Sequence, residues 1–409
     1  MDGELRRAAR TLVFFAQDVS DTSTVKRAEA FVSEGFDLVL FSFLRGRYHR
    51  DFTPPWTVIP LGRTADGRYL RRMFALIRGA LTVARQGRHL RAADAFYARN
   101  IDQLLLALFA RALFRNPAPV VYEVLDIQPA FVRRGALYAL LRAVERYGLH
   151  RIASLVVSSP AFAEHYFRTR QGYTGPWRLL ENKLPPSVLS LPRNSTSARP
   201  KNGRIWTVGY FGLIRGDATF EMMERVAARL RGRVEFHIRG VFTTVNRERF
   251  DALLLRNPNI VYRGEYVSPR DLPYIYGSVD FAWAIDLENQ SHNSRWLLPC
   301  RFYEAGFFGV PCLGVRGFEC GNQIERLEAG WVFPEPLEES LVRFFQTLTT
   351  TEYEATRTRL AALPVRHFVG LPGEFPMDAL LGRNGPVTKS EQVRGERVDT
   401  ADGWGKSLK

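Results

Sequence analysis

The sequence has little cysteine and no long apolar segment. Its only cysteines are Cys300, Cys312 and Cys320, and no pair has the C-x-x-C spacing of a zinc or redox site. A disulfide-stabilised scaffold is therefore not indicated, and we expect reduced, mostly buried thiols. The richest apolar segment, 104–114, contains Arg111 and is shorter than the roughly 18 to 20 residues that a membrane-spanning helix needs. We expect no such helix.

Other patterns are also missing. The first residues, with Asp2, Glu4 and three arginines before Leu12, contain no hydrophobic signal segment, which predicts a cytoplasmic protein. No repeat with a period of about 20 to 50 residues is apparent. No spacing typical of metal ligands is present, so we expect no metal. What is present is a chain of 409 residues, 46% hydrophobic and 12% aromatic, which suits two globular domains of about 150 to 200 residues.

Acidic residues are fewer than basic ones, and the resulting positive charge limits the partners that the chain can have. The 57 Lys and Arg against 42 Asp and Glu give a net charge of +15, which attracts nucleic acid or an anionic membrane surface. In segments 69–91 and 132–151, arginines alternate with aliphatic side chains, as in amphipathic helices that lie on anionic lipid. The arginines expected to face the membrane are Arg71, Arg72, Arg78, Arg85, Arg133 and Arg134. The alternative is that they only solvate the outer faces of core helices.

Apolar strands and amphipathic helices alternate along the chain, which predicts two doubly wound parallel sheets in an α/β fold. In the first half we expect strands at 11–16, 38–43, 57–59, 95–97, 120–122 and 155–158. In the second half we expect strands at 205–211, 234–238, 260–262, 279–285 and 310–315, and a short strand near Trp331. The predicted organisation is a domain at 1–186, an exposed polar linker at 187–204, a domain at 205–352, a helix at 353–368 and a disordered tail at 369–409.

The most informative segment is 293–314, which predicts a short helix, a Gly-Val-Pro turn and a buried strand. Arg301 and Glu304 lie one turn apart on this helix. A cation and an acid at this spacing suit the phosphates and the ribose of a nucleotide. An ordinary surface ion pair is the alternative.

A second candidate anion site is the glycine turn that follows the first strand of the second half. Such a turn delivers backbone N–H groups and a helix N-terminus to a cleft. Its candidate residues are Gly212, Arg215 and Thr219, with Arg215 neutralising a diphosphate. A simple capped turn between strand and helix would suit the same residues. Gly321 and Asn322, ahead of a later helix start, are further candidates as donors to phosphate or to sugar hydroxyls.

Two carboxylates near the end of the strand expected at 120–122 are candidates for acid–base chemistry. Open α/β sheets bind their ligands at the carboxyl ends of their strands. Asp126 is the first candidate for a general base, and Glu123 is the second. Either carboxylate would also suit a structural role as a cap of the following turn.

Segment 299–311 resembles the donor-binding segment of GT-B glycosyltransferases, in which the pattern P-x-[KR]-x-x-E-x-x-x-x-G-x-P recurs. Pro299, Arg301, Glu304, Gly309 and Pro311 fill that pattern here. Over most of its length the chain also resembles bacterial exopolysaccharide glycosyltransferases of the succinoglycan-biosynthesis type. The motifs that carry this resemblance are R-A-x-x-F-x-x-E-G-F-D at 27–37, Y-E-V-L-D-I at 122–127, S-S-P-A-F at 158–162, L-E-N-K at 180–183 and W-L-L-P-C-R-F-Y-E at 296–304.

The resemblance implies a GT-B fold, in which two Rossmann-like domains face a central cleft and the hinge residues Asn182 and Lys183 lie near it. It implies an enzyme without metal or other cofactor that moves a hexose, such as glucose, from UDP-glucose to a lipid-linked oligosaccharide in exopolysaccharide synthesis. Its place would be the inner face of the cytoplasmic membrane. Two positions depart from the family pattern, because Trp296 replaces a glutamate and Leu125 replaces a histidine.

Two other functions fit parts of the sequence. A nucleotide-sugar epimerase with the GT-B fold would also bind a diphosphate, but it needs no membrane. A nucleic-acid-binding protein would use the high positive charge, but it would interleave basic and aromatic residues along one groove. Here the arginines alternate with aliphatic side chains, so we expect no nucleic acid partner.

Overall fold

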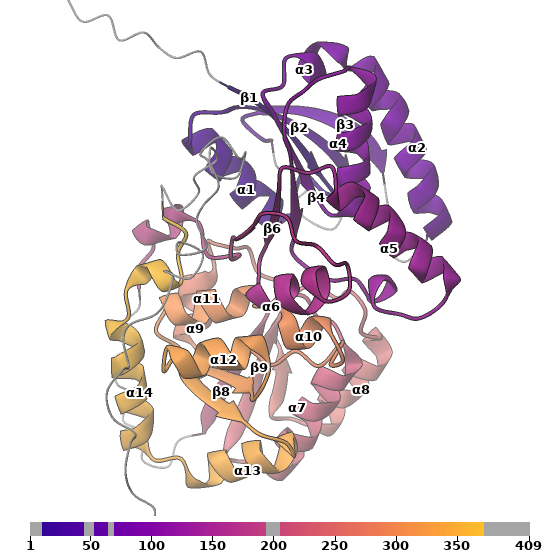
Figure 1. Cartoon of the computed structure of the whole chain (residues 1–409). Helices are drawn as coiled ribbons and strands as arrows, with labels where there is room; N and C mark the ends of the chain where they lie inside the picture. The colour runs from indigo at the N-terminus through magenta and orange to yellow at the C-terminus, as the bar shows by residue number, and fades with distance from the viewer. Residues whose placement is uncertain (1–9, 45–52, 64–68, 194–204, 372–409) are drawn as a thin grey trace, which may run out of the picture.

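The computed structural model describes residues 10–44, 53–63, 69–193 and 205–371, and it places them in two α/β lobes (Figure 1). The strands of the first lobe are β1 (Thr11–Ala16), β2 (Asp37–Leu44), β3 (Thr57–Arg63), β4 (Ala95–Arg99), β5 (Val120–Val124), β6 (Ser154–Val157) and β7 (Trp177–Leu179). They form one sheet in the order β3-β2-β1-β4-β5-β6-β7. All the strands expected in this half are present, whereas the three-residue edge strand β7 was not predicted.

Neighbouring residues of β1 fill two separate cores, because side chains alternate between the two faces of a strand. Leu12 and Phe14 pack with Phe31 of α1 (Thr22–Ser33) on one face. Val13 and Phe15 face the other core, which is covered by a group of helices (Figure 1). The helices and turns in the rest of this lobe are α2 (Tyr69–Arg85), α3 (Gly87–Arg91), α4 (Ile101–Leu113), η1 (Pro129–Phe131), α5 (Ala136–Leu149), α6 (Pro160–Phe162) and η2 (Ala163–Arg168).

The second lobe repeats this design. Its strands are β8 (Trp206–Phe211), β9 (Val234–Arg239), β10 (Ile260–Tyr262), β11 (Phe281–Trp283), β12 (Cys312–Val315) and β13 (Gly330–Phe333), in the order β10-β9-β8-β11-β12-β13. Its helices are α7 (Asp217–Arg229), α8 (Arg247–Arg256), α9 (Leu272–Gly277), α10 (Asn293–Trp296), α11 (Cys300–Phe307), α12 (Glu319–Arg326), α13 (Leu337–Thr347) and α14 (Thr350–Ala362). All neighbouring strands in both sheets run parallel, which confirms the two predicted Rossmann-like domains.

The helix expected at 353–368 is shorter in the structure and begins earlier. Thr349 and Glu352 form a capping box at the start of α14, and the helix ends at Ala362 because Pro364 follows it. A 3-10 turn, η4 (Val365–His367), then brings the chain back to the hinge. There the backbone N–H of Leu184 donates to the carbonyl of Phe368 at 2.9 Å. The chain thus returns to the connection between the lobes.

Two segments assigned to the linker and the tail are packed against the second lobe. The turn η3 (Pro186–Ser190) buries Val188 completely in the same core as Leu184. Val369, assigned to the tail, is also fully buried there and bridges Leu184. Apolar side chains at both positions explain this packing. The remaining linker residues 194–204 and tail residues 372–409 lie outside the described residues.

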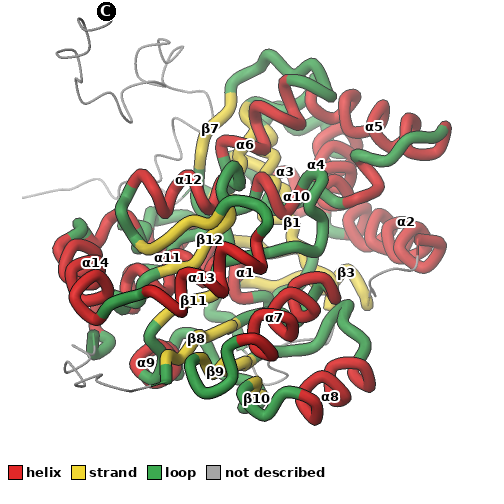
Figure 2. Tube along the Cα trace, turned by 90° about the horizontal axis from the view of Figure 1, so that it is seen from below, coloured by secondary structure: helices red, strands yellow, loops and turns green. Residues whose placement is uncertain are grey.

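The two lobes touch through α10, which belongs to the second lobe by sequence. Both views place α10 beside α6 of the first lobe (Figures 1 and 2). The ring of Trp296 is buried with the core residues of the first lobe. α10 therefore connects the cores of both lobes.

Candidate active site

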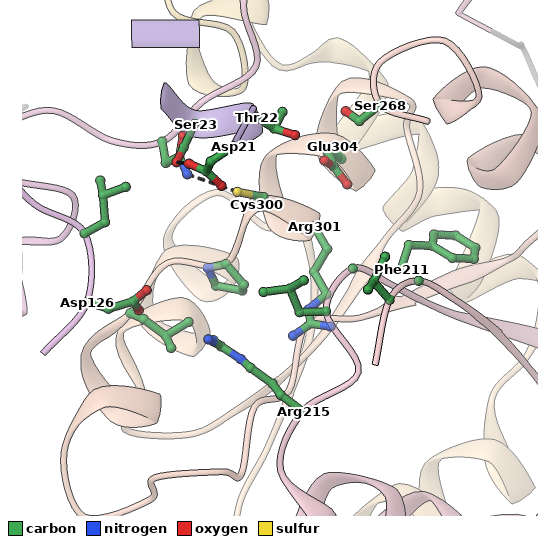
Figure 3. A pocket seen from close by; sticks show the side chains of 18 of the residues that line it. Asp21, Thr22, Ser23, Asp126, Phe211, Arg215, Ser268, Cys300, Arg301 and Glu304 are labelled. Carbon is green, nitrogen blue, oxygen red and sulfur yellow. Dashed lines mark hydrogen bonds between the residues drawn. The ribbon is translucent and has the colours of Figure 1, made fainter. Parts of the chain in front are cut away.

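A cavity of ≈ 360 Å³ lies between the two lobes (Figure 3). It is lined by the chain that follows β1, β5, β6, β8 and β9, and by the start of α11. These are carboxyl ends of parallel strands, where α/β sheets bind ligands. Of the residues predicted from the sequence, the cavity brings together Asp126, Asn182, Gly212, Arg215, Arg301 and Glu304.

Arg301 is buried in the wall of the cavity, with only 6% of its surface exposed. Its guanidinium lies 4.2 Å from the centre of the Tyr210 ring. Within the described residues its Nη1 is buried without a hydrogen-bond partner. A buried donor without a partner costs about 1–3 kcal/mol, and an anionic ligand in the cavity would satisfy it. This arrangement contradicts the alternative of an ordinary surface ion pair.

Glu304 follows Arg301 by one turn of α11 and is equally buried. Its Oε2 accepts a hydrogen bond from the hydroxyl of Tyr276 at 2.8 Å. Burial raises the pKa of Glu304 above its ordinary value, although Tyr276, Lys26 and Arg301 oppose the rise. A buried, oriented carboxylate in this place is suited to accept hydrogen bonds from ligand hydroxyls.

Arg215 reaches the cavity from the chain after β8. Its Nη2 lies 2.9 Å from Oδ2 of Asp286, and its Nε lies 3.5 Å from Oε2 of Glu288. Burial alone would lower the pKa of Arg215, but Asp286 and then Asp126 hold it above the ordinary value. Figure 3 shows the side chains of Arg215 and Arg301 reaching the same part of the cavity, where the charge of Arg215 acts on the pKa of Arg301. The cavity therefore has a cationic centre.

The turn before Arg215 depends on glycine. Gly212 has a φ of 138°, which favours glycine, and a Cβ atom on Gly240 would lie 1.7 Å from the carbonyl oxygen of Gly212. The turns after β8 and β9 can therefore approach each other closely. Both glycines line the cavity.

Asp126 lies just beyond the end of β5, and its side chain is exposed to the cavity. Its Oδ1 accepts a hydrogen bond from Nδ2 of Asn293 at 3.0 Å. The protein atoms around the cavity exclude much of the bulk water, and this desolvation raises the pKa of Asp126, while Arg215 and Asn293 oppose the rise. An accessible carboxylate with a raised pKa is suited to accept a proton.

The geometry agrees with the comparisons with known proteins, although no family model matches the chain. The succinoglycan biosynthesis protein ExoL of Rhizobium meliloti (strain 1021) is 34% identical over 352 residues, or 86% of this chain and 87% of ExoL. The chain belongs to the GT-B glycosyltransferase family that includes ExoL.

Solved structures show the same fold at low sequence identity. Sucrose-phosphate synthase from Thermosynechococcus elongatus has a TM-score of 0.63 at 13% identity, over 91% of this chain and 97% of the synthase. HepE from Anabaena, in complex with UDP and glucose, has a TM-score of 0.61 at 14% identity, over 88% of this chain and 96% of HepE. WaaG, a glycosyltransferase involved in lipopolysaccharide biosynthesis, has a TM-score of 0.60 at 13% identity, over 92% and 100% of the chains. They confirm the predicted GT-B fold.

Glu123, the second candidate for the base, does not lie in the cavity of this ExoL-family protein. It is fully buried inside β5 and forms ion pairs with Arg27 at 2.6 Å and with Arg99 at 2.8 Å. Burial would raise the pKa of Glu123, but the two arginines hold it below the ordinary value. A carboxylate fixed by two arginines away from the ligand site joins α1 to the sheet and is no candidate for a base.

Three residues assigned to donor binding also lie outside the cavity lining. Thr219 is buried in the first turn of α7, and its hydroxyl accepts from the N–H of Leu287 at 3.0 Å. Gly321 and Asn322 lie inside α12, because that helix already begins at Glu319. Gly321 permits close packing on β12, since a Cβ atom would lie 2.0 Å from the Val315 carbonyl oxygen. Asn322 is exposed away from the cavity lining.

The two hinge residues point in different directions. Nδ2 of Asn182 donates to Sγ of Cys300 at 3.2 Å, and both side chains line the cavity. Nζ of Lys183 instead donates to the carbonyl of Arg366 at 2.8 Å and pairs with Glu181 at 3.3 Å. Successive side chains of an extended segment alternate in direction. Lys183 therefore does not add to the positive charge in the cavity.

Lys26 is a cavity residue that sequence reasoning missed. It comes from α1 of the first lobe, and its Nζ donates to the backbone carbonyl of Lys183 at 3.3 Å. Its charge contributes to lowering the pKa of Glu304 on the opposite lobe. In the sequence Lys26 is one of several cations on an amphipathic helix, so only the packing of the lobes distinguishes it.

One side of the first lobe combines exposed apolar side chains with arginines. We define the α2–α5 face by its exposed apolar residues, which are Phe74, Ile77, Leu81, Phe109, Leu113, Leu137 and Leu140. The predicted residues Arg78, Arg85, Arg133 and Arg134 are exposed on the same helices or just before them. Arg71 and Arg72 lie in α2, but their side chains are outside the described part. Among the described helices, none is long and apolar enough to cross a membrane.

Proposed function

We propose that this glycosyltransferase moves glucose from UDP-glucose to a lipid-linked oligosaccharide during exopolysaccharide synthesis. The observation that carries the proposal is Arg301, a residue that lines the cavity between the lobes and whose buried Nη1 has no hydrogen-bond partner within the described residues. A diphosphate supplies the charge and the acceptor atoms that this donor lacks. The family relationship to a succinoglycan biosynthesis protein supports the exopolysaccharide context.

The donor would lie along α11 and the chain after β8. Arg301 and Arg215 would stabilise the negative charge that develops on the diphosphate as the sugar leaves. Glu304 would accept hydrogen bonds from the ribose hydroxyls of the nucleotide. HepE, which shares the fold, has been solved with UDP-glucose and supports the choice of nucleotide. Because the two arginines provide the positive charge, we propose that transfer needs no metal.

Asp126 would act on the acceptor. As the acceptor hydroxyl oxygen bonds to the anomeric carbon, the bond between that carbon and the diphosphate oxygen breaks, and Asp126 takes the hydroxyl proton. The raised pKa of Asp126, caused first by desolvation, brings its proton affinity closer to that needed near neutral pH. Arg215 lies near enough to oppose that rise.

The acceptor would be reached at the inner face of the cytoplasmic membrane. The α2–α5 face offers apolar side chains such as Phe74, Leu137 and Leu140, each at least 60% exposed. Arginines near an anionic leaflet contribute about 1 kcal/mol each to binding. Apolar insertion and arginine attraction together would hold the first lobe, which carries Asp126, next to a lipid-linked acceptor.

The experiment that tests the donor site is isothermal titration of the purified protein with UDP, UDP-glucose and GDP-mannose. We expect micromolar binding of UDP and UDP-glucose, lost in Glu304→Ala and kept in Glu221→Ala, which removes an exposed carboxylate from α7. Chelation with EDTA should leave this binding unchanged. A folded wild-type protein that binds none of these nucleotides would refute the proposal. An epimerase would be recognised by conversion of the sugar nucleotide without any acceptor.

A further inference from the structure

α10 is a helical turn that the second lobe inserts into the first. Asn293 at its start is only 6% exposed, and Trp296 at its end is buried in the core of the first lobe. The hydroxyl of Ser159 donates to the carbonyl of Trp296, and His165 stacks on the Trp296 ring with centroids 5.8 Å apart. The position of α10 is therefore fixed by side chains of the opposite lobe.

The side chain of Asn293 forms two hydrogen bonds across the lobes. Its Oδ1 accepts from the N–H of Ile127 at 2.9 Å, and its Nδ2 donates to Oδ1 of Asp126 at 3.0 Å. The first bond decides the orientation of the amide, because only an oxygen can accept from Ile127. The amino group must then face Asp126. Within the described residues Oδ2 of Asp126 has no hydrogen-bond partner, so this oxygen is left to take a proton.

We infer that Asn293 is a positioning residue for Asp126, so that the general base of the first lobe is oriented by the lobe that binds the donor. This inference rests on the proposed transfer reaction. Asp126 is then oriented as a base only while α10 is inserted into the first lobe. Activation of the acceptor therefore depends on the docking of the lobe that binds the donor. Trp296, which replaces a glutamate of the family pattern, provides the buried anchor for this turn.

Charged groups from several elements surround Asp126 and shift its pKa. Arg215 from the chain after β8 lowers its pKa, whereas Asp286 from the chain after β11 and Asp21 at the start of α1 raise it. Desolvation, the largest cause, also raises it, and the hydrogen bond from Asn293 lowers it. Loss of that bond therefore moves the pKa of Asp126 further upward. Because a base must be ionised, the acid limb of the rate profile would move to higher pH.

The test measures kcat against pH for the wild type and for Asn293→Ala, Asn293→Asp and Ser159→Ala. Asn293→Asp keeps an acceptor for Ile127 and nearly the same shape, but it removes the donor to Asp126. We expect both Asn293 variants to lower kcat about tenfold, to leave the KM for UDP-glucose unchanged and to move the acid limb upward. Ser159→Ala removes a different bond between the lobes without touching Asp126, and should leave the acid limb in place.

A double-mutant comparison tests the same inference without relying on the pH profile. If Asn293 acts through Asp126, Asn293→Ala has no further effect on kcat in an Asp126→Asn background. Equal effects of Asn293→Ala and Ser159→Ala, or additive effects of Asn293→Ala and Asp126→Asn, would overturn the positioning role. An active wild type with an unchanged Asn293→Ala variant refutes only this inference, whereas a wild type without transfer activity refutes the proposed function as well.

Discussion

The Nδ2 of Asn182 donates to the Sγ of Cys300 at 3.2 Å, and this contact ties the hinge to the first residue of α11. It places a thiol in the wall of the proposed donor site, one residue before Arg301. Cys312 and Cys320 are buried in the second lobe. Cys300 is therefore a chemical probe of the cavity.

Alkylation of Cys300 by N-ethylmaleimide should abolish UDP binding, and bound UDP should slow the alkylation. Burial raises the pKa of Cys300 above its ordinary value, so the reactive thiolate is scarce at neutral pH. The reaction should accelerate as the pH rises, and Cys300→Ser should remove the label from the native protein. Mass spectrometry of the labelled peptide checks this. Labelling at the same rate with saturating UDP would contradict the placement of the donor.

Arg301→Met should weaken UDP binding by about 10- to 100-fold, because charge-assisted hydrogen bonds contribute about 1.5–3 kcal/mol. The same change should not lower the melting temperature of the free protein, since it removes the buried, unpaired Nη1. Calorimetric titration and thermal unfolding measure the two effects. Arg249→Met, which removes an exposed arginine from α8, should change UDP affinity little. Loss of stability together with full affinity would contradict the assignment.

Glu123→Gln should destabilise the first lobe by about 3–5 kcal/mol, because it leaves Arg27 and Arg99 buried without their anionic partner. The pKa of Glu123 in the folded protein is lowered by the two arginines against the effect of burial. The contribution of Glu123 to the free energy of unfolding is therefore complete above the pKa of the unfolded chain, about 4.3, and is lost as the pH falls toward the lower pKa of the folded protein. Urea unfolding between neutral and acidic pH measures this.

In Glu123→Gln the free energy of unfolding should lack the part of the pH dependence that comes from Glu123. Glu221→Gln is a matched control, because Glu221 also pairs with an arginine but is exposed. UDP affinity should be unchanged in Glu123→Gln at a temperature where the lobe is folded. A large loss of affinity in the folded variant would show that Glu123 acts on the ligand after all.

Binding to vesicles that contain anionic lipid should depend on the α2–α5 face. Replacing Arg133 and Arg134 by Gln should lower the partition constant about 30-fold, given about 1 kcal/mol for each charge. Leu137→Ser with Leu140→Ser should weaken binding at high salt as well, because apolar insertion is not screened. Sedimentation with vesicles measures both. Arg247→Gln with Arg249→Gln on the second lobe serves as the control, and an equal loss there would point to unspecific charge attraction.

The two carboxylates predicted as candidate bases show what the sequence could predict and what it could not. Asp126 and Glu123 are close in the chain, and both suited the same motif. Glu123 lies inside β5, and the partners that neutralise it, Arg27 and Arg99, are 96 and 24 residues away. Asp126 lies beyond the strand and faces the cavity. The point at which β5 ends decides which of the two carboxylates can face the cavity. The sequence alone does not fix that end to within a residue.

The strands and the α11 site could be predicted for a related reason. Buried parallel strands are continuous apolar runs, and Arg301 and Glu304 are separated by one helical turn, so local spacing carries the information. Lys26 and Asn293 could not be found this way, because their roles arise where one lobe packs against the other. Thr219 was assigned to donor binding, but its hydroxyl accepts a hydrogen bond from the N–H of Leu287, a partner 68 residues away that local spacing does not show.

The second lobe starts and finishes at one place. Leu184 enters it and Val369 leaves it, and the two residues form a backbone bridge. A unit whose ends meet can be cut out and replaced, or its ends can be joined, without stretching the chain on either side. If the second lobe binds the donor, as proposed, exchange of this one unit would change the sugar nucleotide while the first lobe keeps its own sequence.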